Sequence, residues 1–142
     1  MTFAATKALA RLFCITLIGC MVANAQCSVK TVLVKGKVEH APGKATVRVE
    51  LVYPKRRPGE SGEVTVENGR FSIPIEFLTQ SNRPLLTIVP VKCNRKPQTV
   101  VITLETIDQE YDRVSLDLSK DFKMAGSTAY ALRSEIILKG PS

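Results

Sequence analysis

The chain has 142 residues, a formal net charge of +7 and no tryptophan, and aromatic residues make up only 6% of it. This length fits one domain with a real core but not two, and the ordinary composition excludes a low-complexity protein. Because aromatic residues are few, Val, Ile and Leu must build the core, and these side chains favour strands.

The N-terminal residues 1–25 have the layout of a secretory signal peptide. Two cations precede the apolar run 12–22, and Ala23 and Ala25 form a small-x-small cleavage site. The run is about half of the ~20 residues that a membrane-spanning helix needs. We therefore expect residues 1–25 to be removed and residues 26–142 to form one secreted or periplasmic domain.

A second interpretation of the N-terminus centres on Cys20. Leu17-Ile18-Gly19-Cys20 resembles a bacterial lipobox, in which Cys20 would carry a lipid and become the first mature residue. The protein would then be anchored to the envelope membrane. Ordinary cleavage after Ala25 is favoured, because Ala23-x-Ala25 fits the small-residue rule well.

Cysteine usage agrees with export. Cys14 and Cys20 lie in the apolar run and would leave with it, whereas Cys27 and Cys93 remain as an even pair. We predict a Cys27–Cys93 disulfide that closes a long loop and stabilises the fold by roughly 3–5 kcal/mol. Two cysteines and the single His40 do not make a tetrahedral site, so no metal is expected.

Apolar residues alternate with polar ones along most of the domain, which predicts strands. Asn68-Gly69 predicts a tight hairpin, and Pro74 predicts that its strand lies at a sheet edge or carries a bulge. Residues 54–62 contain two prolines and two glycines and are expected to form a loop. The expected strands are residues 32–38, 45–53, 63–67, 70–77, 85–93, 98–105 and 111–118.

The C-terminal segment 127–138 fits two structures. Its apolar residues alternate as in a strand, but Ser127 and Gly140-Pro141 could also bound a short helix. We favour a strand, because everything before this segment is β. Seven or eight short strands with frequent turns predict an all-β protein with a single antiparallel β-sandwich, a barrel being the alternative.

Three short motifs occur in a characteristic order. Residues 34–38 read VKGKV, residues 45–47 read ATV, and residues 65–71 read TVENGRF. This series resembles the opening strands and the Thr-x-x-x-Gly-x-Phe hairpin of the carboxypeptidase regulatory-like domains, a transthyretin-like (prealbumin-like) β-sandwich family. The resemblance covers roughly residues 32–102. It implies a structural, adhesive or ligand-presenting module on a secreted or cell-surface protein, without catalysis or cofactor.

No residue pattern indicates a catalytic centre. His40 is the only histidine and lies at the end of an expected strand, where an exposed position is typical. Asp108, Glu110 and Asp112 would share one face of an extended segment, more in keeping with solvated surface than with the paired carboxylates of a glycosidase. We expect no enzyme and no cofactor; the alternative is a small secreted hydrolase or an enzyme inhibitor.

Two basic clusters remain, one after the second expected strand and one around the end of the fifth. If both fall at one end of a sandwich, they form a rim that can take an anionic glycan, an envelope component or another protein. An ordinary solvated loop surface is the alternative. No aromatic platform accompanies the charge in the sequence, so no nucleic acid is expected. The residues of this expected rim are Lys55, Arg56, Arg57, Lys92, Arg95 and Lys96.

Overall fold

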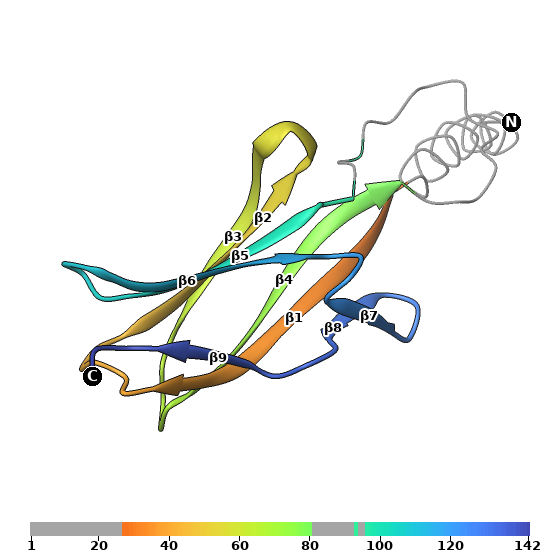
Figure 1. The fold of residues 1–142 in the computed structure, drawn as a ribbon. Coiled ribbons are helices and arrows are strands. Elements are labelled where there is room, and N and C mark those ends of the chain that lie inside the picture. The colour runs from red at the N-terminus through yellow and green to blue at the C-terminus, as the bar shows by residue number, and fades with distance from the viewer. Residues whose placement is uncertain (1–26, 81–92, 94–95) are drawn as a thin grey trace, which may run out of the picture. The chain divides into compact units, whose positions relative to one another are not determined.

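The computed structural model describes residues 27–80, 93 and 96–142, and nearly all regular structure in them is β-strand. One 3-10 turn, η1 (Pro54–Arg56), interrupts the strands. The strands are β1 (Cys27–Glu39), β2 (Thr46–Tyr53), β3 (Arg57–Thr65), β4 (Arg70–Gln80), β5 (Thr99–Glu105), β6 (Glu110–Asp117), β7 (Phe122–Ala125), β8 (Ala129–Leu132) and β9 (Ile136–Lys139) (Figure 1).

The strands form two packed sheets. Sheet A has the order β4-β1-β8-β7, and β9 also pairs with β1; sheet B has the order β3-β2-β5-β6. All pairs within sheet B are antiparallel, whereas β8 and β9 both run parallel to β1. The predicted all-β sandwich is confirmed. The described strands number nine rather than seven or eight. The parallel pairs of β1 with β8 and β9 make sheet A mixed, whereas the expected sandwich was antiparallel throughout.

The core lies between the inner faces of the two sheets. Every second residue of β2 is buried, and so are Val100, Ile102 and Leu104 of β5 together with Thr103. Val49 and Ile102 pair directly across these strands. Burying each such aliphatic side chain contributes about 1.5–3 kcal/mol. The side chains with no exposed area include Val32, Val34, Val47, Val49, Leu51, Val100, Ile102, Leu104 and Leu138.

The predicted hairpin at Asn68-Gly69 is confirmed. Both residues have positive φ angles, 53° and 68°, and the flanking Glu67 and Arg70 exchange backbone hydrogen bonds of 3.0 and 2.9 Å. These angles fit the two-residue turn that Asn-Gly favours. Pro74 lies on β4, which is an edge strand as its missing N–H predicted.

The expected loop at residues 54–62 is wrong. Only η1 is a turn, and β3 begins at Arg57 and pairs with β2. Its proline and glycines are tolerated because β3 is an edge strand and because they allow close packing. A Cβ on Gly59 would lie 2.7 Å from the Leu51 carbonyl oxygen, and one on Gly62 would lie 2.9 Å from the Ile75 side chain.

The C-terminal segment is extended, as expected, but divided. Within residues 127–138 the chain forms β8, leaves the sheet, and returns to β1 as β9. The sequence did not predict β7, which precedes this segment, because only its first residue, Phe122, is buried. A four-residue strand with one buried position carries too little alternation to be recognised.

The chain divides into two compact units. Residues Val29–Phe77 and Arg95–Ser142 form the unit that carries nearly all of both sheets, and Cys27 and Cys93 belong to the other unit, with the first residues of β1 and the last of β4. The predicted disulfide joins these two cysteines, with Cα atoms 5.7 Å apart. The expected strand at residues 85–93 lies outside the described residues except for Cys93, which is not in a strand.

Candidate functional site

Four of the predicted rim cations are described, and they lie at one end of sheet B. Lys55 and Arg56 belong to the turn after β2, and Arg57 begins β3. The Gln98 N–H, just before β5, donates to the Val52 carbonyl at 2.8 Å, so the chain near Lys96 lies at the same end. We call Lys55, Arg56, Arg57 and Lys96 the cationic end; Lys92 and Arg95 lie outside the described residues.

The turn holds two cations in an unusual backbone conformation. Lys55 has φ 66° and ψ 29°, and Arg56 has φ 58°, so both are left-handed, and both side chains are exposed. This conformation costs about 1–2 kcal/mol for each residue with a Cβ atom. Asn-Gly is the usual solution for such a turn, and this chain uses it at Asn68-Gly69. At the cationic end it keeps Lys and Arg instead.

Two cations of this end rest on aromatic rings. The Arg57 guanidinium lies 6.0 Å from the centre of the Tyr53 ring, and Lys96 Nζ lies 5.3 Å from the centre of the Tyr130 ring. The two tyrosines are only 4% and 8% exposed. The sequence did not predict these contacts, and Lys96 and Tyr130 are far apart in the chain. The buried rings help to hold the two cations in place rather than offer open stacking platforms.

No carboxylate among the described residues forms an ion pair with the cationic end. The turn after β6 lies at this end, since the Leu118 N–H donates to the Gln98 carbonyl at 3.0 Å. Its Asp117 carboxylate accepts hydrogen bonds from the hydroxyl and N–H of Ser119 and from the Lys120 N–H. These bonds lower the pKa of Asp117 below its usual range. The carboxylate is thus engaged within its own turn, and the cations stay open to an external anion.

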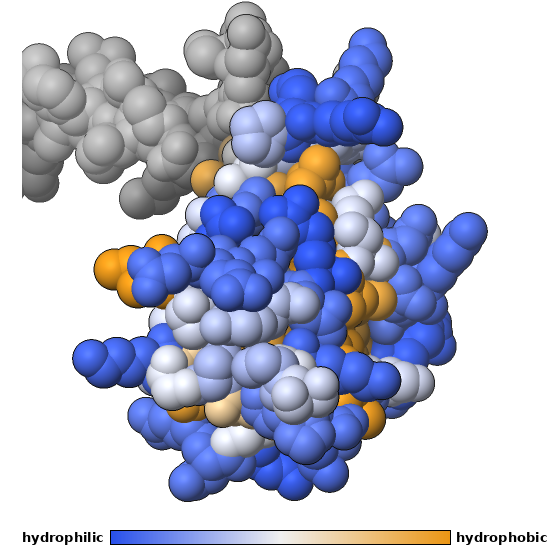
Figure 2. Space-filling view, turned by 60° about the vertical axis from the view of Figure 1, so that its left-hand side comes forward, coloured by the Kyte–Doolittle hydropathy of each residue, from blue (hydrophilic) through white to orange (hydrophobic). Residues whose placement is uncertain are grey.

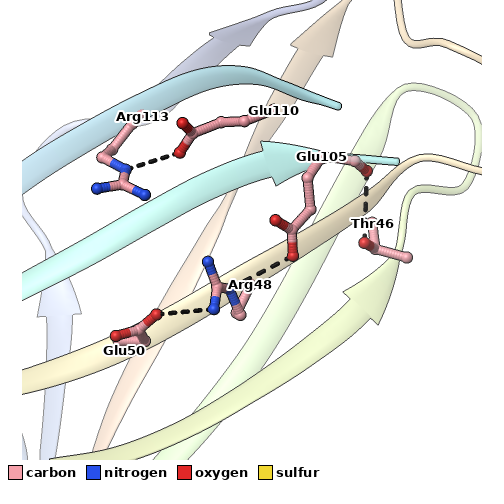
Figure 3. Close-up of polar contacts among 6 residues, drawn as sticks. All are labelled: Thr46, Arg48, Glu50, Glu105, Glu110 and Arg113. Carbon is pink, nitrogen blue, oxygen red and sulfur yellow. Dashed lines mark hydrogen bonds and ion pairs between the residues drawn. The ribbon is translucent and has the colours of Figure 1, made fainter. Parts of the chain in front are cut away.

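The candidate catalytic residues are not assembled into a site. His40 is exposed and directly follows β1. The expectation that Asp108, Glu110 and Asp112 share one face is wrong, because a register shift sets Asp112 opposite the buried Leu104 and Glu110 opposite Glu105, on different faces of the sheet. Glu110 pairs with Arg113 at 2.7 Å (Figure 3), whereas Asp112 accepts the Lys139 N–H at 2.8 Å and so links β6 to β9.

A shallow groove of about 650 Å³ lies beside β1. It forms because β1 pairs with β8 as far as Leu33 and with β9 from Gly36 onward, while residues 132–135 connect these two pairings. Arg70 and Glu135 face each other across it at 3.5 Å. Its other lining residues are Lys35, Gly36, Glu67, Phe71, Ser72, Leu132 and Ser134. Both signs of charge line the groove, so it favours no single class of ligand.

No family model, curated protein or solved structure matches the chain. Among the described residues no helix is long and apolar enough to span a membrane. The same part of the chain contains no cluster of three or more His, Cys, Asp or Glu side chains suited to a metal ion.

Proposed function

We propose that this protein is an exported, non-enzymatic β-sandwich that binds an anionic ligand through its cationic end. The ligand class that fits best is a polyanionic chain, such as an anionic glycan of the envelope. Several cations along one edge can each contact a negative charge of such a chain. Binding then releases the counterions of the polyanion, which favours the complex.

One observation carries the proposal: Lys55 and Arg56 occupy left-handed positions at the tip of the turn. Strained positions of this kind cluster at functional sites, and Asn and Gly would fit the same turn at lower cost. His40 and Lys44 are also left-handed, but only Lys55 and Arg56 are consecutive cations within the cationic end. The motif resemblance to carboxypeptidase regulatory-like domains supports a ligand-presenting role, and the Cys27–Cys93 disulfide supports an oxidising compartment.

The proposal is tested with heparin as the polyanionic probe. The variant Lys55→Gln, Arg56→Gln, Arg57→Gln removes three charges from the cationic end. We expect its affinity at low salt to fall about tenfold or more, and its salt dependence to become shallower, since fewer counterions are released. Isothermal titration calorimetry at several salt concentrations measures both quantities.

The control removes three charges elsewhere. Lys35, Lys37 and Lys123 are exposed and form no ion pair among the described residues. The variant Lys35→Gln, Lys37→Gln, Lys123→Gln therefore has the same net charge as the first. If both variants lose affinity equally, binding depends on net charge alone, and the assignment to the cationic end is wrong.

Export and anchoring are tested by the intact mass of the protein isolated from its source cells. Ordinary cleavage predicts a first residue at Gln26 and a mass two hydrogens below that of the reduced chain. Lipidation predicts a first residue at Cys20 with a diacylglyceryl adduct. A full-length chain with reduced thiols contradicts the proposed export.

A further inference from the structure

The outer faces of the two sheets carry opposite charge, and the proposed anion binding does not explain this. Register and burial assign the strand residues of the sheet-bearing unit to an inner or an outer face. Surfaces of soluble proteins usually intersperse both signs. Folding requires only that the outer faces be polar. It does not explain why positive charges gather on one sheet and negative charges on the other.

The outer face of sheet A is cationic. On β1, Lys35 and Lys37 alternate with buried residues and project outward. Lys123 shares this face, because it pairs with Ala131, which in turn pairs with Leu33 of β1. The strand residues with charge on this face are five cations, Lys35, Lys37, Arg70, Lys123 and Lys139, and two carboxylates, Glu39 and Glu76.

The outer face of sheet B is anionic. Its centre is an ion-pair chain in which Arg48 lies 3.1 Å from Glu50 and 3.3 Å from Glu105 (Figure 3). The Glu105 carboxylate lies near the buried Arg48 Nε without hydrogen-bond geometry, and Glu50 lies near Nη1. One guanidinium charge therefore faces two carboxylates, which leaves a negative excess. The strand residues with charge on this face are two cations, Arg48 and Arg113, and five carboxylates, Glu50, Glu63, Glu105, Glu110 and Asp117.

Both faces also offer apolar contact area. Ile137 on sheet A is 49% exposed and pairs with Lys37, so it lies among the lysines of this face. Val101 on sheet B is partly exposed beside Glu50. The space-filling view in Figure 2 shows a mostly hydrophilic surface on which apolar residues form a broken band.

We propose that a second copy of this chain docks the outer face of its sheet B on the outer face of sheet A. The net excess is three positive charges on the outer face of sheet A and three negative charges on that of sheet B. The two faces of different copies are therefore complementary in charge. Such a head-to-tail contact is heterologous and leaves one face of each kind free, so association continues into stacks. An anionic membrane would use only the cationic face and leave the acidic one unexplained.

Sedimentation velocity of the purified protein tests this docking. We expect concentration-dependent association at ~20 mM salt that is lost at ~500 mM, because the Debye length falls from about 20 Å to about 4 Å and salt screens the attraction between the two faces. The variant Lys35→Glu, Lys37→Glu, Lys123→Glu makes both faces acidic, and Ser61→Lys, Glu63→Lys, Ser115→Lys makes both faces basic. Each variant alone is expected to stay monomeric, and an equimolar mixture is expected to associate again.

The circular dichroism spectrum of each variant, which should match that of the unaltered protein, checks that it folds. The matched control Lys55→Glu, Arg56→Glu, Arg57→Glu reverses the cationic end, and we expect it to stack like the unaltered protein. A monomer at low salt overturns the proposal, whether or not it binds anionic vesicles through Lys35, Lys37 and Lys123. So does stacking that survives in either face variant. Neither result bears on heparin binding at the cationic end.

Discussion

At the scale of single residues, a few glycines decide how closely the chain can pack. Gly59 lies on β3 against the side chain of Tyr53 and the backbone of Leu51, where no Cβ atom fits. Gly43, in the turn between β1 and β2, has nothing within 4 Å of the position of a Cβ. The same residue type therefore has a packing role at one site and none at the other.

We predict that Gly59→Ala destabilises the protein by about 1–3 kcal/mol, because the added methyl group displaces the Tyr53 ring or the β2 backbone. Gly43→Ala is expected to change stability by no more than about 1 kcal/mol, and in the stabilising direction. Urea denaturation of both variants measures the difference. Equal stability of the two would mean that β3 does not pack against Tyr53 as described.

At the scale of elements, local sequence signals predicted what local interactions determine. The predictions of strands β2 and β5 and of the Asn68-Gly69 turn are confirmed, because each depends on residues that are neighbours in the sequence. The prolines and glycines of residues 54–62 indicated a loop, yet this segment contains most of an edge strand. A segment with proline can form a strand at the edge of a sheet. Its position in the sheet is set by pairing with strands that are distant in the sequence.

The cationic end shows the same limit. The run Lys55–Arg57 could be found in the sequence, but the placement of Lys96 at the same end depends on the register between β2 and β5. The rings beneath Arg57 and Lys96 come from different sheets, and Tyr130 is 34 positions away from Lys96 in the sequence. Nothing in the spacing of these residues predicts the contact. The left-handed angles of Lys55 and Arg56 were likewise hidden, since neither residue type favours them.

The β2–β3 turn gives a prediction in which stability and binding change in opposite directions. Lys55→Asn with Arg56→Gly introduces the residues that this turn prefers, so we expect a gain of about 1 kcal/mol and a rise in Tm of several degrees. Heparin affinity should fall, since two cations are lost. Thermal unfolding followed by circular dichroism measures the first effect.

The reciprocal change serves as the control for that prediction. Asn68→Lys with Gly69→Arg puts Lys and Arg at two left-handed positions that Asn and Gly occupy in the unaltered protein. This change should lower Tm. An unchanged or lower Tm in the variant Lys55→Asn, Arg56→Gly would contradict the strain on which the functional argument depends.

At the scale of the whole molecule, the disulfide connects cysteines 66 positions apart in the sequence. In the chain-entropy view, closing a loop of this length restricts the unfolded chain and stabilises the fold by about 4 kcal/mol. We predict that Cys27→Ser with Cys93→Ser lowers the free energy of unfolding by roughly 2–5 kcal/mol while the circular dichroism spectrum stays β-rich, since nearly all strand residues lie in the other unit. A change below about 0.5 kcal/mol would show that the bond does not constrain the unfolded chain.

The central claim, that the cationic end binds anionic ligands, is tested most directly by NMR. Amide and side-chain resonances of the isotopically labelled protein are followed during titration with a short heparin oligosaccharide. We predict that the largest shifts occur at Lys55, Arg56, Arg57 and Lys96. Shifts centred instead on the outer face of sheet A, at Lys35, Lys37 and Lys123, or no shifts at all at low salt, would contradict the claim.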